Sequence, residues 1–294
     1  DSAYTYASAI NEAYANDGIR KPRYHEYEMN AFKTGAYPQY YPNVNWVDEV
    51  FKDAAATNIA NMSLRGGGSK FRYFAMFNWV TDNGFIANAK ANDGYSTQNK
   101  SSKANLRTNL DIDLTPSTKM TLNLLGTLAE TNKPGDSADL WSMIYSLPAT
   151  AFPVKTENGL WGGNTTWDGT KNPVAQSQAA AYTKGHNRSL YADMTLKQDL
   201  SSILPGLGAG FMLAYDNWAS YVENHSKTYR YGSDNVQWKS GKPVFVSQYT
   251  AGTESEMNTG SELSAWKRNF NMALAVDYKF ENEIHSVYTL EMES

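Results

Sequence analysis

Apolar and polar residues alternate along most of the chain after about residue 70. The clearest case is "KANLRTNLDIDLT" at residues 103–115, in which the even positions are mostly apolar and the odd positions are charged or amide residues. A period of two predicts an extended strand with one apolar and one polar face. The same period predicts further strands within residues 71–80, 118–131, 189–200, 207–221 and 269–280, and about eight strands in all.

The first fifty residues follow a different pattern. Residues 2–17 have a helical composition, with Tyr6, Ile10 and Tyr14 four positions apart on one face and Gly18 as a stop signal. The stretch around Pro38 to Pro42 is predicted to be a loop, and "NWVDEVFKDAAA" at residues 45–56 a short amphipathic helix. The chain is therefore expected to begin with a helical segment and to continue as an all-β structure.

Short and long connections alternate between the predicted strands. The short ones are "GGGS", "PST", "SSILPG" and "NE", whose glycine, proline, serine and asparagine residues are typical of tight hairpins. In "GGGS" the glycines are expected to supply the positive φ of a two-residue turn. The "RGGGSK" run lacks the spacing and the following helix of a phosphate-binding loop. The long connections cover about residues 82–102, 132–187 and 222–265.

A soluble sandwich or barrel and a lipid-facing barrel both produce alternating strands. A membrane barrel needs strands of roughly nine to eleven residues, with short turns on one side and long loops on the other. Its aromatic residues gather near the strand ends. The following aromatic residues lie near the ends of the predicted strands: Phe71, Tyr73, Trp79, Trp218, Tyr221, Trp266 and Phe280. Strand length, loop alternation and these aromatics favour a large antiparallel transmembrane β-barrel.

Composition narrows the classes of function. The chain has 294 residues, of which 41% are hydrophobic and 13% aromatic, and its mean hydropathy of -0.57 is that of a soluble protein. No apolar stretch approaches the roughly 20 residues of a transmembrane helix. The net charge of -4, without a basic run, argues against a nucleic-acid partner. Because cysteine is absent, disulfides, thiolate zinc sites and cysteine nucleophiles are excluded.

Several segments, taken in order, resemble one family. They are "YYPNVNWVDEVFK", "NMSLRGGGSKFRYFAMFNWVTDNGFI", "NLRTNLDIDLTPSTKMTLNLLGTL", "LPATAFPV" at residues 147–154 and "NPVAQ" at residues 172–176. Their order and spacing are similar to those of the SusC/RagA-type TonB-dependent transporters of the Bacteroidota outer membrane. The resemblance implies a closed barrel of 22 strands that encloses an N-terminal plug. It also implies active import of oligosaccharides or peptides, without catalysis and without a cofactor.

The resemblance also implies partners and a place in a longer protein. Residues 1–56 would be a helical and loop segment at the start of the barrel, and residues 57–294 would be barrel strands. The plug, the TonB box and the remaining strands would lie elsewhere in the parent protein. A SusD-like surface lipoprotein would cap the barrel, and the TonB–ExbB–ExbD complex would supply energy through the plug region. The native setting would be the lipid of the outer membrane.

Two groups of residues are candidates for function. The polar row Arg107, Asn109, Asp111 and Asp113 is expected to face the barrel lumen, where it binds solute, contacts the plug or is simply hydrated. In the long loops, Trp161, Asn164, Trp167 and Trp238 suit a glycan site, because aromatic rings stack on sugars and amides bind hydroxyls. Packing among the loops or against a capping lipoprotein explains these loop residues equally well.

No chemistry-bearing arrangement points to an enzyme. The four histidines are scattered without metal-ligand spacing, and no Gly-x-Ser-x-Gly nucleophile elbow is present. No catalytic residue and no metal ligand is therefore predicted. Besides active import, a secreted or surface β-rich glycan-binding module and a passive porin remain as alternatives.

Overall fold

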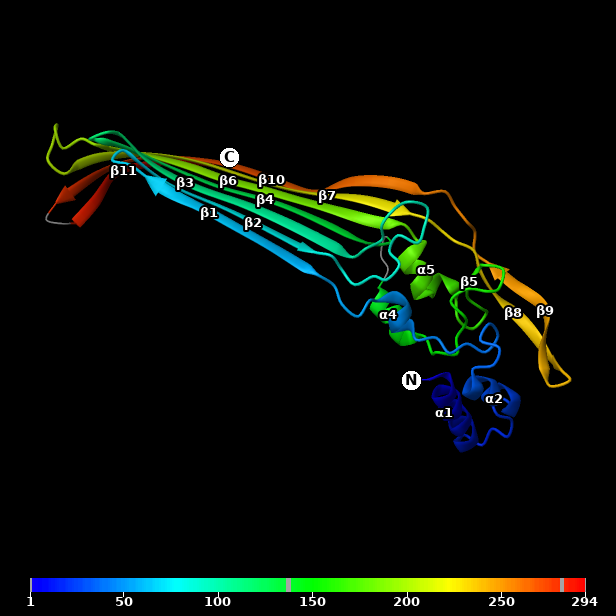
Figure 1. The fold of residues 1–294 in the computed structure, drawn as a ribbon. Helices are drawn as coiled ribbons and strands as arrows, with labels where there is room; N and C mark the ends of the chain where they lie inside the picture. Colours follow the sequence, from blue (N-terminus) through cyan, green and yellow to red (C-terminus); the bar gives the residue numbers. More distant parts are fainter. Residues whose placement is uncertain (1, 136–138, 281–282, 294) are drawn as a thin grey trace.

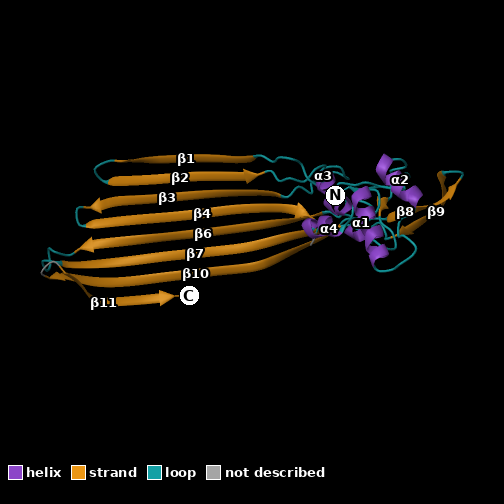
Figure 2. Ribbon diagram, turned by 90° about the horizontal axis from the view of Figure 1, so that it is seen from below, coloured by secondary structure: helices purple, strands orange, loops and turns teal. Residues whose placement is uncertain are grey.

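The protein is all-β, and its main element is one large antiparallel sheet (Figure 2). The computed structural model describes residues 2–135, 139–280 and 283–293. Eight strands lie in the order β1-β2-β3-β4-β6-β7-β10-β11, so each strand pairs with its neighbour in this series. Their bounds are β1 Thr57–Gly67, β2 Phe71–Asp82, β3 Lys100–Thr115, β4 Thr118–Pro134, β6 Tyr182–Asp199, β7 Leu207–Ser226, β10 Asn258–Phe280 and β11 Glu283–Glu293. The predicted all-β class is confirmed, and so is the prediction of about eight strands in its main antiparallel sheet.

The two ends of the sheet differ. Among the described residues, the short connections lie at one end, called here the turn end, and the long connections and the helices gather at the other, the loop end (Figures 1 and 2). The strands are longer than the alternation predicted, since β7 has 20 residues and β10 has 23. The predicted loop at residues 222–265 is wrong, because β7 continues to Ser226, a hairpin follows, and β10 begins at Asn258.

The glycines at the turn between β1 and β2 have a different role from the predicted one. None of Gly66, Gly67 and Gly68 has a positive φ. Instead, Gly66 and Gly67 belong to β1 and pair with Tyr73 and Arg72. A Cβ atom on Gly66 would lie 2.8 Å from the Tyr73 hydroxyl oxygen, and one on Gly67 would lie 2.6 Å from the Phe71 carbonyl oxygen. The glycines are needed here because only hydrogen fits beneath the returning strand.

One face of the sheet is apolar across all eight strands, because the register aligns the apolar positions of neighbouring strands. In one row, Leu64 pairs with Ala75, and the row continues through Thr108, Leu124, Ala192, Tyr215 and Phe270. The next row toward the turn end contains Tyr73, Leu110, Leu122, Met194, Leu213, Met272 and Met292. Many of these side chains are exposed. This surface is called the apolar face below.

The opposite face carries hydrogen bonds between polar side chains of adjacent strands. Asn78 donates to Asn61 and accepts a bond from Asn105 at 3.3 Å, and Thr127 donates to Asn105 at 2.9 Å. A second series runs from Asn109 through Asn123 to Asp193. Side chains that join strands in this way stabilise the sheet and leave a wettable surface. This surface is called the polar face below.

The loop end folds into a compact body of short elements. The helices are α1 Ala3–Asn16, α2 Glu26–Thr34, α3 Trp46–Val50, α4 Leu140–Ser146 and α5 Pro173–Gln178, with a 3-10 turn at Gly169–Lys171. A small sheet of β5 Trp161–Gly162, β8 Tyr231–Lys239 and β9 Lys242–Ala251 completes it. The helix expected at residues 2–17 is present, that at residues 45–56 is much shorter, and α2, α4 and α5 were not predicted. No helix in the described residues is long and apolar enough to cross a membrane.

Two buried clusters hold this body together. The first joins Trp46 and Val50 of α3 to three other residues. They are Ile144 of α4, Phe152 in the segment after α4, and Val174 of α5. The second joins α1 and α2 around Ala7, Phe32 and Tyr41. Three of the segments that resemble the transporter family therefore meet in the first cluster: "NWVDEV", "LPATAFPV" and "NPVAQ". Their residues lie far apart in the sequence but pack on one another in the folded chain.

Candidate functional site

The polar row predicted from the sequence lies on the polar face of β3. Asp111 accepts a hydrogen bond from the Thr121 hydroxyl at 2.9 Å, and Asn109 donates to Asn123. Arg72 of β2 lies with its Nε atom 3.9 Å from an Asp111 oxygen and its Nη1 atom 4.0 Å from an Asp113 oxygen. Arg107 stands between Met76 and Leu125 in the register. These exposed contacts are weak individually, so the row can exchange them for contacts with another polar surface at little cost.

The predicted loop residues occupy two places within the loop-end body. Trp161 and Trp167 pack against the first buried cluster, and Asn164 lies between them in the chain. Trp238 of β8 packs instead against the second cluster, where its indole Nε1 donates to the Tyr41 hydroxyl at 2.5 Å. The structure thus brings three of the four residues into one region and places Trp238 among the aromatic residues of the N-terminal helices.

Asn164 positions Trp167. The Asn164 side chain accepts hydrogen bonds from the backbone amides of Thr166 at 2.9 Å and Trp167 at 2.7 Å, and its Nδ2 donates to the Ala151 carbonyl at 2.8 Å. An asparagine that bonds to its own backbone two and three residues on is typical of a tight loop. Its three bonds fix the loop that presents the Trp167 ring, which is a structural role.

Trp161 is held by a cation and an aromatic ring. The Lys155 Nζ lies 4.2 Å from the centroid of its ring, and Tyr229 approaches edge-on at 6.1 Å. Burial raises the pKa of the Tyr229 hydroxyl, which donates to the Gly169 carbonyl at 2.9 Å. With both sides of the ring contacted, Trp161 acts as packing between β5 and the turn before α5.

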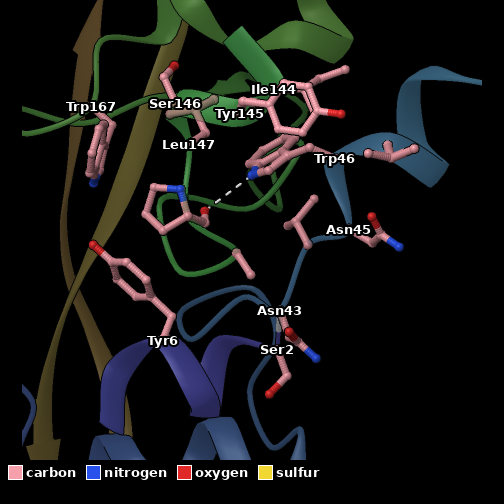
Figure 3. A pocket seen from close by; sticks show the side chains of 14 residues that line it. Ser2, Tyr6, Asn43, Asn45, Trp46, Ile144, Tyr145, Ser146, Leu147 and Trp167 are labelled. Atoms are coloured by element: carbon pink, nitrogen blue, oxygen red, sulfur yellow. Dashed lines mark hydrogen bonds between the residues drawn. The ribbon is translucent and has the colours of Figure 1, made fainter. Parts of the chain in front are cut away.

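Trp167 contributes to a groove of about 730 Å³ between α1, the α3 N-terminus and α4 (Figure 3). Tyr6 and Trp167 stand on one side of it, with Trp46 and Tyr145 on the other. The lining residues are Ser2, Tyr6, Asn43, Val44, Asn45, Trp46, Val47, Ile144, Tyr145, Ser146, Leu147, Pro148, Ala149 and Trp167. All of them are uncharged, and they combine aromatic rings with amides and hydroxyls. Such a lining suits a neutral polar ligand rather than an ion.

One wall of the groove is buried and hydrogen-bonded, whereas its rim carries exposed side chains. Trp46 is buried, and its Nε1 donates to the Pro148 carbonyl at 3.2 Å. Asn43 accepts a hydrogen bond from the Ala3 amide at 2.7 Å, which ties α1 to the segment before α3. Tyr145, in contrast, is 78% exposed. Burial raises the pKa of the Tyr6 hydroxyl, so it stays protonated and able to donate a hydrogen bond.

An aromatic row continues from the groove across the outside of α3 and α4. Trp141 stacks on Phe51 at 4.6 Å between ring centroids and on Tyr145 at 6.0 Å, with interplanar angles of 27° and 19°. Trp141 is 54% exposed. A second hollow of about 460 Å³ lies beside Phe51 and Trp141, and Val47 lines both hollows. The two hollows and the row form one continuous aromatic surface, called the capture surface below.

The sequence analysis did not identify Tyr6, Trp141 and Tyr145 as site residues. Tyr6 was used only as a helix signal, and Trp141 and Tyr145 lie in a stretch expected to be a loop. The spacing of four residues between Trp141 and Tyr145 places both on one face of a helix, and this signal was available. In the described residues, no group of three or more histidine, aspartate and glutamate side chains could hold a metal ion.

Asn172 organises the loop beneath the groove. It is completely buried, and its Oδ1 accepts from the amides of Val174 at 3.1 Å and Ala175 at 3.2 Å at the start of α5. Its Nδ2 donates to the carbonyls of Gly162 at 3.1 Å and Val154 at 3.3 Å. Pro173 follows at the first helical position, where its missing N–H has no cost. The "NP" pair therefore joins three loop segments that support Trp167.

Comparison with known proteins gives a limited result. No protein-family model matches the chain, and no curated protein matches it. Among solved structures, the chain is similar to the RagAB peptide transporter, with 13% identity and a TM-score of 0.36 over 99% of this chain and 37% of that one. It is also similar to the RagAB peptide importer in the closed-closed state (12%, 0.38, covering 97% and 39%) and in the open-open state (13%, 0.40, covering 98% and 39%). The chain spans less than two fifths of those chains.

Proposed function

We propose that this chain forms part of the wall and of the outer mouth of an outer-membrane barrel that imports oligosaccharides or peptides. The observation that carries the proposal is the two-faced sheet, with a continuous exposed apolar face opposite a face of hydrogen-bonded polar side chains. A membrane barrel has this arrangement, with the apolar side toward lipid and the polar side toward its interior.

The apolar face has the height of a bilayer core. Along β10 it runs from Trp266 to Val276, which is ten residue steps, or about 33 Å along the strand and about 25 Å once a barrel tilt is allowed for. Polar groups bound it at both ends. Thr118 donates to Gln198 at 2.6 Å toward the turn end, and His186 lies 3.4 Å from Glu130 toward the loop end. A water-soluble protein would seldom leave an apolar area of this extent uncovered.

Aromatic residues mark the borders of the apolar face. Phe71 and Tyr73 lie near the turn end, and Trp79, Tyr221 and Trp266 near the loop end, as in the interfacial belts of barrels. Trp218 departs from the predicted belt, because its pairing with Ser189 places it on the polar face. Phe280, also predicted for the belt, has a side chain outside the described residues.

Closure of the barrel requires further strands. In the described sheet, β1 and β11 are at the edges, each paired on one side only. Unpaired backbone groups are not tolerated in the hydrocarbon region, so both edges need partners. The parent protein would supply them together with a plug, as the family resemblance implies. The row Arg107, Asn109, Asp111 and Asp113 would then face the plug.

The capture surface would bind substrate at the outer mouth. The uncharged aromatic and amide lining of its larger hollow suits the faces and hydroxyls of a sugar or the backbone of a peptide. A SusD-like lipoprotein would close over the loop-end body, and TonB–ExbB–ExbD would drive the plug. No catalytic step and no cofactor is part of the proposal, and Trp161, Asn164 and Trp238 serve to build the mouth.

Binding and uptake by the native protein test the proposal. The protein that carries residues 1–294 is expected to require detergent for extraction and to lose uptake when TonB is deleted. Replacement of both Trp141 and Tyr145 by alanine should weaken oligosaccharide or peptide binding at least tenfold, because two exposed stacking surfaces are removed. The matched control is Phe245→Ala, an equally exposed aromatic residue on β9. Recovery as a stable water-soluble monomer would contradict the proposal and favour the glycan-binding module.

A further inference from the structure

Two arginines interrupt the apolar face near its loop-end border. Arg188 of β6 pairs with Leu128 on one side and Ala219 on the other, and Arg268 of β10 pairs with Asn217. Both guanidinium groups belong to exposed residues. A charged side chain on a lipid-facing surface is unfavourable unless it lies near the interface or has an anionic partner.

These two arginines differ from Arg72 in their lack of a carboxylate partner among the described residues. In the described part of the sequence, neither Arg188 nor Arg268 forms an ion pair. Two glutamates on this face lie beside a histidine instead, with His186 Nδ1 3.4 Å from a Glu130 oxygen and His186 Nε2 3.6 Å from a Glu223 oxygen. The Arg268 guanidinium lies 5.5 Å from the centroid of the Trp266 ring. The two positive charges are therefore available to an external anion.

A hollow in the sheet surface leads away from Arg188 along the apolar face. Two depressions of about 490 and 560 Å³ share Arg188, Ala104 and Leu128 in their linings. The one nearer the turn end is lined by Phe77, Leu106 and Leu190 and passes over Gly126. Gly126 contributes to the depth, because a Cβ atom built there would meet nothing within 4 Å. The result is an apolar trough with a guanidinium at its upper end.

The other depression, toward the loop end, is more polar. Its lining includes Glu130, His186 and Tyr221, above Ala219 and Leu263. Polarity thus increases along the trough from the middle of the apolar face toward the loop end. A lipid has the same gradient, from an acyl chain through a charged head group to water.

We propose that this trough binds a phosphorylated lipid of the outer leaflet. The phosphate accepts hydrogen bonds from Arg188, which lines the trough, and from Arg268, which lies on the same face on the far side of β7. An acyl chain lies over Gly126 between Phe77, Leu106 and Leu190. Guanidinium groups bind phosphate with two parallel N–H donors, which gives a strong charge-assisted contact. The inference rests on the proposed function, since it requires the apolar face to meet the bilayer.

Native mass spectrometry of the full-length protein in detergent tests this site. The probe is monophosphoryl lipid A, and the comparison lipid is its dephosphorylated form. The wild-type protein is expected to retain the phosphorylated lipid more tightly than the dephosphorylated one. The Arg188→Gln/Arg268→Gln double variant should bind the phosphorylated lipid at least tenfold more weakly and lose this preference. The control is Arg107→Gln, which removes an arginine from the polar face of the same sheet.

The outcomes separate this proposal from the proposed function. A membrane-extracted double variant that binds both lipids as the wild type does would overturn the lipid site and leave the importer intact. An equal loss in Arg107→Gln would also overturn it, because a general loss of charge would then explain the result. A third variant, Gly126→Leu, fills the trough without altering charge and should weaken binding of the acylated probe. Wild-type protein that is soluble without detergent and binds neither lipid would overturn both proposals.

Discussion

Arginine substitutions along β4 measure how the two faces of the sheet differ, as changes in the free energy of unfolding. Leu124 and Leu125 are adjacent leucines of nearly equal exposure, 36% and 39%, on opposite faces of the strand. Leu124 pairs with Thr108 and Ala192 in the middle of the apolar face, and Leu125 with Arg107 and Tyr191 on the polar face. Met120 lies four residues from Leu124 on the apolar face, about 13 Å toward the turn end.

The bilayer sets the expected magnitudes. Leu124→Arg places a charge at the midplane and should reduce the free energy of unfolding by about 2–4 kcal/mol. Met120→Arg lies near the interface and should cost about 0–1 kcal/mol. Leu125→Arg faces water, so its cost should come mainly from repulsion by the opposite Arg107 and amount to about 0.2–1 kcal/mol.

Equilibrium unfolding in urea of the full-length protein, folded into phosphatidylcholine vesicles, measures these differences. Tryptophan fluorescence reports the transition, and a common m-value makes the three variants comparable. A much larger loss of unfolding free energy in Leu124→Arg than in Met120→Arg or Leu125→Arg is specific to a bilayer. Equal costs at Leu124 and Met120 would refute the depth argument. A larger cost at Leu125 than at Leu124 would refute the assignment of the faces.

Two further predictions concern the loop-end body. Asn172→Ala removes four hydrogen bonds of a buried side chain, including the α5 cap, and should destabilise this region by about 2–4 kcal/mol. Proteolysis within residues 139–181 should become faster. The heat-modified gel mobility of the barrel should stay unchanged. The Lys227 ammonium, whose Nζ lies 2.6 Å from an Asp93 oxygen, holds the pKa of Asp93 below its usual value. Because that pKa is depressed in the folded state, the stabilisation is present above about pH 4 and is lost as the pH falls through the lowered value. Hydrogen exchange of residues 83–99 should therefore accelerate at low pH in the wild type but not further in Asp93→Asn, and identical pH profiles would contradict this.

The strands could be predicted from the sequence because the alternation within each strand shows which of its side chains face apolar and which face polar surroundings. Alternation in residues 103–115 depends only on which face each side chain occupies, and the short turns carry local signals. The predicted row of Arg107, Asn109, Asp111 and Asp113 thus lies on one face, as expected. Strand length was underestimated since alternation weakens near the loop end, where β7 and β10 leave the apolar rows and continue as polar strands.

The loop-end body could not be derived in the same way. Its core joins Trp46 to Phe152 and Val174, which lie more than a hundred positions further along the chain, and no local period records those contacts. Trp238 illustrates the consequence. A tryptophan among polar loop residues suggested a ligand site, but its hydrogen bond to Tyr41 and its packing against the second cluster depend on the N-terminal helices. Short helices such as α4 and α5 are stabilised by this tertiary packing rather than by their own sequences.

The most direct test of the central claim is a nitroxide scan of β4 from Met120 to Leu128. Because residues 1–294 contain no cysteine, single cysteines introduced there are labelled without background from this segment. With the full-length protein in vesicles, collisions with oxygen report lipid, and collisions with a water-soluble nickel chelate report the aqueous phase. The account predicts strict alternation, with oxygen access at even positions and greatest depth near Leu124, and nickel access or protein contact at odd positions. Nickel access at Leu122, Leu124 and Gly126, or no alternation at all, would contradict it.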